Sequence, residues 1–251
     1  MNIQYKNKNK MISNKLKNTI NEINIDTNCI KKKVRKTRIK RQCINKEIFI
    51  FLMEEIKKSN YAYKKTFNII LLNSLLYLTG CRIGEILLLN KVNITSLFNN
   101  GKHSAYCPKT KSLRTIYLNN DGKNFILNNL GLNEIDFYTN LNEKGLVNLY
   151  DNKLDKRTAY NWMDKYFQLF TEKYYNTQYE NKNNEIAFNF HSFRVNLINN
   201  LCRNCENLDE VCKVSRLIGH KNLNTTFIYW RENKIDEKEI NDKLNKALNL
   251  T

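Results

Sequence analysis

The feature that most constrains the fold is the spacing of apolar residues after Cys43, which follows a helical period everywhere except one block. That block, 92–118, contains three short β-favouring runs at 92–98, 103–107 and 113–118, separated by turn-like residues. Helices are predicted over 44–58, 63–78, 83–89, 124–129, 154–175, 191–203, 208–218, 224–232 and 237–248, with a polar loop at 176–184. The pattern therefore predicts a mainly helical α+β fold with a small three-stranded antiparallel sheet.

Composition excludes several classes of protein. The chain has 251 residues, and no apolar run approaches the roughly 20 residues of a membrane span. Its first 17 residues are polar and rich in lysine, so we expect no secretory signal. Seven cysteines in a chain of this length indicate free thiols in a reducing, intracellular compartment, such as the cytoplasm, the nucleoid or an organelle stroma. The net charge of +18 makes a polyanion the expected partner.

The positive charge is concentrated at the N-terminus. Residues 1–42 hold 13 basic and 2 acidic side chains, a net of 13 − 2 = +11, whereas the other 209 residues carry 29 − 22 = +7. We expect 1–42 to be a flexible basic arm and 43–251 to be the folded domain. A DNA-phosphate contact is favoured over a merely solvated tail or a transit peptide. The candidate DNA-binding residues are Lys31, Lys32, Lys33, Arg35, Lys36, Arg38, Lys40 and Arg41.

Three short motifs place cations and potential proton-transfer groups at helical spacing. The first is Thr79-Gly80-Cys81-Arg82-Ile83-Gly84-Glu85, the second is His191-Ser192-Phe193-Arg194, and the third is Leu217-Ile218-Gly219-His220 with Tyr229 nine residues later. Taken singly, each has an ordinary structural explanation: a surface ion pair, a helix-capping pair, or a core tyrosine. Their combination in this order is far more specific.

Together these motifs resemble the tyrosine recombinase (phage integrase) family, over about residue 43 to the C-terminus. The family's boxes T-G-x-R-x-x-E, H-x-x-R and L-x-G-H, with a tyrosine nine residues after the last histidine, are all matched. The family also has a hairpin lysine five residues before an arginine, a spacing that Lys109 and Arg114 fit. Lys102 and Lys111 are rival candidates for that lysine.

The resemblance implies the tyrosine recombinase catalytic fold. It also implies a site-specific recombinase that cleaves and rejoins duplex DNA through a 3′-phosphotyrosyl intermediate. Arginines suit this chemistry because a guanidinium stays charged and holds phosphate oxygens bidentately. A phenol has a pKa near 10 and needs a base or a cationic pocket, and the leaving deoxyribose oxygen needs a proton. The implied catalytic residues are the clamp Arg82 and Arg194, the third phosphate donor His220, the base His191, the acid Lys109 and the nucleophile Tyr229. Glu85 is expected to brace the site, through Arg194 or His191.

The chemistry implied by the resemblance requires no cofactor, because the covalent bond conserves the energy of the phosphoester. The sequence shows no carboxylate cluster suited to two magnesium ions. One C-x-x-C pair, Cys202 and Cys205, with Cys212 nearby, is a weak zinc signal; packing as small apolar residues is favoured. We therefore expect no metal site.

The chain departs from most family members because only 42 residues precede the catalytic pattern, too few for the usual core-binding domain. An accessory DNA-binding protein or the arm could supply the missing contact. The resemblance also implies a tetramer at synapsis, from a free monomer or dimer, with 237–248 either linking protomers or packing in its own chain. A type IB topoisomerase-like enzyme and a non-catalytic DNA-binding relict are the alternatives. The segment Thr225-Thr226-Phe227-Ile228-Tyr229 lacks the S-K-x-x-Y of the former, and the intact motifs disfavour the latter.

Overall fold

The structure is a computed structural model that describes residues 42–175 and 187–234. Residues 1–41 of the predicted arm, the polar loop 176–184 and the predicted helix 237–248 lie outside the described residues. The helices are α2 (Lys46–Lys58), α3 (Tyr63–Thr79), α4 (Ile83–Ile86), α5 (Lys91–Asn100), α6 (Asn120–Leu130), α7 (Glu134–Asn140), α8 (Lys156–Tyr174), α9 (Phe190–Arg203), α10 (Leu208–Ile218) and α11 (Asn224–Lys234). The strands are β1 (Lys102–Cys107) and β2 (Ser112–Tyr117).

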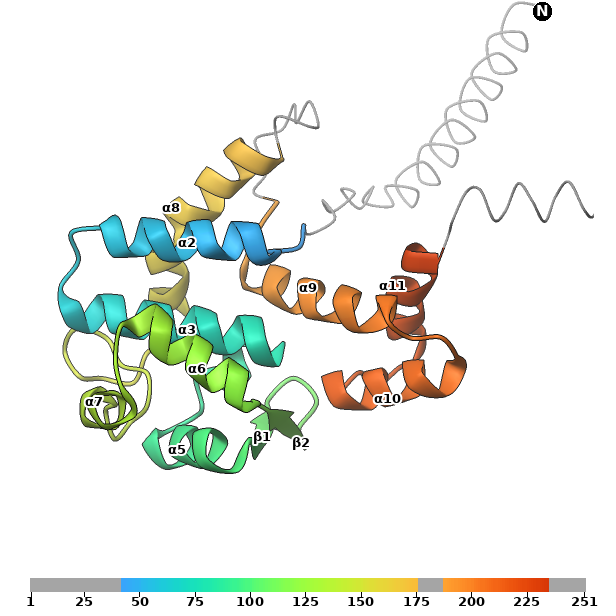
Figure 1. The fold of residues 1–251 in the computed structure, drawn as a ribbon, viewed down its shortest axis with the longest axis horizontal. Helices are drawn as coiled ribbons and strands as arrows, with labels where there is room; N and C mark the ends of the chain where they lie inside the picture. Colours follow the sequence, from blue (N-terminus) through green and yellow to red (C-terminus); the bar gives the residue numbers. More distant parts are fainter. Residues whose placement is uncertain (1–41, 176–186, 235–251) are drawn as a thin grey trace, which may run out of the picture. The chain divides into compact units, whose positions relative to one another are not determined.

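Helix α3 is the centre of the core. Its side chains from Phe67 to Leu76 are all buried, so the helix is enclosed around its whole circumference, and most of these side chains are apolar. Helices α2, α6 and α9 pack against it, and Figure 1 shows α2 running alongside it and α6 crossing over it. This packing fixes the C-terminal end of α3, where the first motif begins.

A second cluster of buried residues joins α9, α10 and α11 beside α3. Ile198 and Cys202 from α9 meet Val211, Val214 and Ile218 from α10, all at most 9% exposed. Residues of α11 pack onto the same cluster, so the second and third motifs belong to one packed unit. Figure 1 shows these three helices gathered together.

The predicted strand at 92–98 is wrong, because this segment is the helix α5. Its buried residues are Ile94, Leu97 and Phe98, which lie on one helical face, whereas Val92 is 70% exposed. The Asn90 side chain caps the helix by accepting a hydrogen bond from the Asn93 N–H at 2.9 Å. The β-branched residues of this segment favour a strand, but the spacing of its buried residues and the Asn90 cap favour a helix. The sheet consequently has two strands in the described residues, not three.

The two strands form an antiparallel hairpin in which Ala105 pairs with Arg114 and Cys107 with Ser112. The turn 108–111 carries Lys109 and Lys111, and Lys111 has a left-handed φ of 51°. Side chains alternate along β2, so Leu113 and Tyr117 are exposed while Arg114 and Ile116 point inward. The hairpin therefore presents a lysine turn to solvent and an arginine to the interior.

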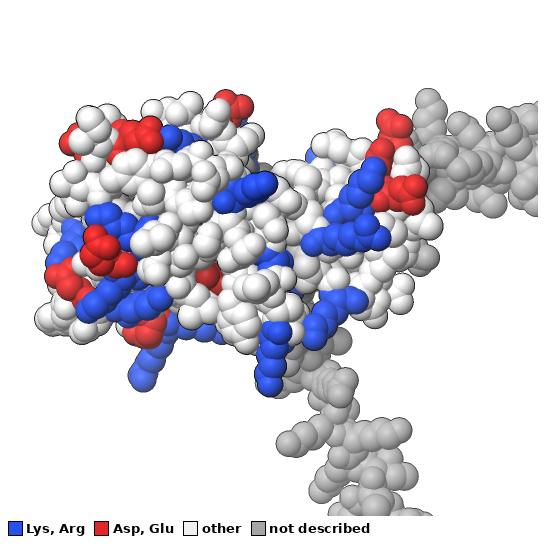
Figure 2. Space-filling model, turned by 90° about the horizontal axis from the view of Figure 1, so that it is seen from below, with Lys and Arg blue, Asp and Glu red and all other residues white. Residues whose placement is uncertain are grey.

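Charge is unevenly spread over the face drawn in Figure 2. Lysine and arginine side chains occur at its left end, along its lower edge and on its right, with much of the middle uncharged, and most of the aspartate and glutamate side chains lie towards its two ends. No helix among the described residues is long and apolar enough to span a bilayer.

Candidate active site

The turn between α3 and α4 positions the first motif. The Thr79 hydroxyl donates to the Leu75 carbonyl at 2.6 Å, and the Cys81 N–H donates to the Thr79 hydroxyl at 3.3 Å. Gly80 has a φ of 59°, and a Cβ there would lie 2.6 Å from Leu197 Cδ2 on α9. Glycine is therefore required at position 80 for two reasons: the left-handed backbone conformation and the close approach of α9. The turn delivers Arg82 to the start of α4.

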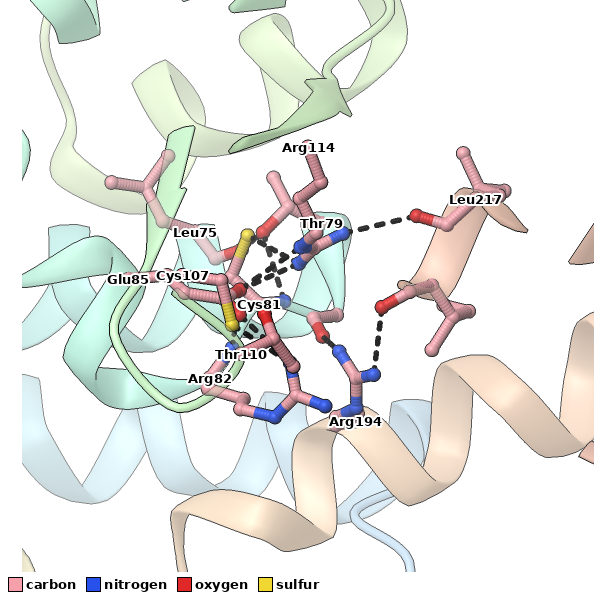
Figure 3. Close-up of polar contacts among 12 residues, drawn as sticks. Leu75, Thr79, Cys81, Arg82, Glu85, Cys107, Thr110, Arg114, Arg194 and Leu217 are labelled. Carbon is pink, nitrogen blue, oxygen red and sulfur yellow. Dashed lines mark hydrogen bonds and ion pairs between the residues drawn. The ribbon is translucent and has the colours of Figure 1, made fainter. Parts of the chain in front are cut away.

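Glu85 is the centre of the polar network and is 1% exposed. Its carboxylate accepts four hydrogen bonds: from Arg82 N–H at 3.0 Å and Nη1 at 2.9 Å, and from Arg114 Nε at 3.1 Å and Nη2 at 2.7 Å. Burial alone would raise the pKa of Glu85, but the charge and hydrogen bonds of Arg114 lower it to about 2. Glu85 is thus ionised and holds two guanidiniums in place (Figure 3).

Two buried cysteines complete this cluster. Arg82 Nη1 donates to Cys107 Sγ at 3.3 Å, and Arg114 Nη2 donates to Cys81 Sγ at 3.0 Å. Burial raises the pKa of Cys81 to about 11, so its thiol is protonated at neutral pH. Both sulfur atoms serve as acceptors that orient an arginine.

Arg194 brings the second motif to the same place. It is 1% exposed, and its Nη1 donates to the Gly80 carbonyl at 2.8 Å while Nη2 donates to the Ile218 carbonyl at 2.7 Å. Burial, followed by the charge of Arg82, lowers the pKa of Arg194 to about 10, so it remains charged at neutral pH. Arg194 therefore ties α9 to both the first and the third motif, as Figure 3 shows.

His220 lies just after the left-handed Gly219 that ends α10. Its Nδ1 is 2.9 Å from the Thr226 hydroxyl, on α11. Burial, then the charges of Arg194 and Arg82, lower the pKa of His220 to about 4, which makes the imidazole neutral at pH 7. If the Thr226 hydroxyl donates to Nδ1, the remaining ring proton is on Nε2, where it can be donated to a substrate oxygen.

Tyr229 and His191 come from α11 and α9. Tyr229 is half-buried and packs against the apolar cluster of α9 and α10, one turn after Thr226. The Trp230 indole N–H donates to the Cys205 carbonyl at 3.1 Å, which anchors α11 to the end of α9. His191 is exposed in the first turn of α9, and its charge also lowers the pKa of His220.

The structure thus brings together four of the predicted residues, Arg82, Glu85, Arg194 and His220, and places His191 within electrostatic reach. Glu85 contacts Arg82 and Arg114, where the sequence suggested Arg194 or His191. Lys109 lies at the exposed hairpin turn, with no hydrogen bond or ion pair to the described residues. Its role remains a prediction.

Three side chains in the polar network are not predicted from the sequence. Arg114 enters the sequence argument only through its distance from Lys109, Cys107 only as part of a strand, and Thr226 only as part of the segment that ends in Tyr229. The alternation of side chains along β2 could have identified Arg114 as inward-pointing, but no sequence pattern identifies Cys107 or Thr226. No group of three potential metal ligands occurs within residues 42–175 and 187–234. Cys202 and Cys205 are instead buried in the apolar cluster.

In chemical terms the site suits a compact anion. Two guanidiniums, Arg82 and Arg114, pair with the Glu85 carboxylate, and the guanidinium of Arg194 lies nearby, which gives a net charge of 3 − 1 = +2. The adjacent His220 is neutral. Arg82 is the accessible member, with 23% of its side chain exposed. Preorganised donors of this kind bind phosphate oxygens and stabilise charge that develops on them.

The comparison with protein families agrees with this geometry. The model of the phage integrase family matches residues 44–235, and the chain belongs to that family. No curated protein matches the sequence.

Several solved structures share the fold. XerH site-specific recombinase, bound to palindromic difH substrate in a post-cleavage complex, matches with a TM-score of 0.54 and 19% identity. That match covers 86% of this chain and 55% of the XerH chain, so this chain spans just over half the length of XerH. The Tn1549 transposon integrase, in complex with transposon right end DNA, matches with a TM-score of 0.50 and 16% identity, over 85% of this chain and 68% of the integrase. These likenesses confirm the predicted tyrosine recombinase catalytic fold.

Proposed function

We propose that this chain is a site-specific recombinase that breaks and rejoins duplex DNA through a covalent bond to Tyr229. The observation that carries the proposal is the meeting of Arg82, Arg194 and His220, from three separated motifs, around a site with a net positive charge. Family membership and neighbours whose structures contain DNA support the same conclusion.

In the proposed cleavage step the Tyr229 oxygen attacks the phosphorus while the bond from phosphorus to the 5′ oxygen breaks. The tyrosine proton goes to His191, and the leaving 5′ oxygen takes a proton from Lys109. The products are a 3′-phosphotyrosyl bond and a free 5′-hydroxyl, and the reverse reaction with another strand rejoins the DNA. No cofactor takes part in either direction.

The buried state of Arg194 has a consequence for this step. Two of the five N–H groups of a guanidinium are used on backbone carbonyls, which leaves 5 − 2 = 3 for other partners. Because Arg194 is 1% exposed, neighbouring side chains must shift before a phosphate reaches it. Arg82 is the first phosphate contact, and His220 donates the third hydrogen bond.

A suicide substrate tests the proposal. On a duplex nicked just beyond the cleavage site, the wild-type protein should accumulate as a covalent adduct, because the released fragment diffuses away. Tyr229→Phe should form none, whereas Tyr150→Phe, at a tyrosine that is 84% exposed, should behave as wild type. An adduct with Tyr229→Phe would refute the assignment of the nucleophile.

We also propose that the basic arm binds DNA phosphates and that four protomers act at synapsis. Replacing the eight cations at 31–41 by glutamine in the full chain should flatten the salt dependence of binding, by about 0.9 in log K against log salt for each lost contact. An unchanged slope would show that the arm makes no such contact. Relaxation of a supercoiled plasmid that lacks a cognate site would favour the topoisomerase alternative.

A further inference from the structure

Arg114 has a position that the cleavage step above does not use. It lies on β2, two residues after the strand begins, and only 8% of its side chain is exposed. Three of its four hydrogen bonds point into the first motif, to Glu85 and Cys81. The fourth, from Nη1, reaches the Leu217 carbonyl on α10 at 3.0 Å. One side chain therefore touches the hairpin, the Arg82 turn and the third motif.

The hydrogen bond from Arg114 to Leu217 crosses a loosely packed region between β2 and α10. Two hollows of about 260 and 460 Å³ lie between β2 and α10, and both are lined by Arg114, Thr115, Tyr117 and Leu217. Residues of α3 and α9 also line the smaller one. Within residues 42–175 and 187–234, the bond from Arg114 to Leu217 is the one hydrogen bond that joins β2 to α10. The hollows leave little packing between the hairpin and α10, so the guanidinium of Arg114 makes a large part of their contact.

The end of α10 is shaped to receive this side chain. Gly219 has a φ of 72°, and a Cβ at that residue would lie 2.8 Å from Arg114 Cδ. The arginine stem thus occupies the space that any larger residue would fill, immediately before His220. A displacement of Arg114 would therefore change the positions of both the hairpin and His220.

We propose that Arg114 is a positioning residue that holds the hairpin turn, and with it Lys109, in a fixed place relative to Arg82 and His220. This inference rests on the proposed function, in which Lys109 protonates the leaving 5′ oxygen. The turn begins only a few residues before Arg114, and loss of the Leu217 contact removes the hydrogen bond by which the strand after that turn is held to α10. A proton donor misplaced by about 1 Å costs on the order of a hundredfold in rate.

The test compares two substrates that differ in one atom. In the second, sulfur replaces the bridging 5′ oxygen, so the phosphorus–sulfur bond breaks and a thiolate leaves without needing a proton. Arg114→Met should cleave the oxygen substrate about a hundredfold more slowly than wild type, and the sulfur substrate within about tenfold of wild type. Lys109→Ala should show the same pattern, whereas Arg82→Ala should be slow on both. Arg157→Met, at an exposed position on α8, is the matched control and should cleave both normally.

Equal slowing of Arg114→Met on both substrates would overturn the proposal, because Arg114 would then act on the phosphate clamp and not on the hairpin. If Arg114→Met does not fold, Arg114→Lys serves instead, since an ammonium can pair with Glu85 but cannot also span to Leu217. Arg114→Lys should likewise cleave the sulfur substrate much closer to the wild-type rate than the oxygen substrate. Equal slowing on the two substrates would again contradict the proposal. Failure of the proposed function is distinguishable, because wild type itself would then form no adduct with either substrate.

Discussion

Replacement of Glu85 by glutamine removes the negative charge at the centre of the site while keeping its size. The carboxylate is buried and holds Arg82 and Arg114, so the variant leaves two guanidiniums without their counter-charge. Breaking a buried pair in this way costs about 3–5 kcal/mol. The pKa gives a similar figure. A fall from 4.5 to about 2 is worth about 3 kcal/mol, because each tenfold change in proton affinity is worth about 1.4 kcal/mol.

The sign of the pH dependence follows from the lowered pKa. Stability from ionised Glu85 is fully present above pH 4.5 and is lost as the pH falls towards 2, where the folded protein also takes up the proton. In urea denaturation followed by tryptophan fluorescence, Glu85→Gln should therefore be about 3 kcal/mol less stable than wild type at pH 7. The gap should narrow by about 2 kcal/mol at pH 3.

The matched control is Glu55→Gln, which removes a surface partner of Lys58 with 29% of its side chain exposed. This change should cost less than about 1 kcal/mol and vary little with pH. A Glu85→Gln cost as small as that of the control, or a gap that stays constant between pH 7 and pH 3, would refute the reasoning.

Three further predictions concern the surroundings of His220. Thr226→Val should slow cleavage about tenfold, because the imidazole loses the partner that orients it, while Thr226→Ser should restore the rate. The lowered pKa of His220 means that stability falls between pH 6.5 and 4, since only the unfolded chain takes up the proton there; His220→Gln should flatten that part of a pH–stability profile. Gly219→Ala and Gly131→Ala both place alanine at a φ near 70° and should lose about 1–2 kcal/mol in thermal melts, but only Gly219→Ala, which meets Arg114, should also slow cleavage.

The helical part of the fold could be predicted from the sequence because the apolar period is strong and the caps are recognisable. Helices α3 and α10 begin and end within a residue of the predicted ranges. The segment 92–98 was misassigned because Val92 and Ile94 favour strands locally, while the burial of Ile94, Leu97 and Phe98 decides in favour of a helix. Helix α7 was missed because its seven residues are too short for a period to show.

The candidate site residues could be predicted because their three motifs together resemble the ordered boxes of one family, and phosphate chemistry explains why arginine, histidine and tyrosine occur in them. The roles of His191, Lys109 and Tyr229 stay predictions. Contacts that depend on tertiary packing could not be predicted in this way. The long-range partner of Glu85 is Arg114, 29 residues away on a strand, and the partner of His220 is Thr226 on the next helix. Neither pairing leaves a sequence period that could identify it.

The most direct measurement is the identity of the residue that becomes linked to DNA. After trapping on a nicked duplex, the adduct would be digested with nuclease and protease, and the modified peptide would be sequenced by mass spectrometry. A nucleotide attached through its 3′ phosphate to Tyr229 is the predicted result. Attachment to any other residue, or the absence of an adduct on DNA that the protein demonstrably binds and cleaves, would contradict the proposed mechanism.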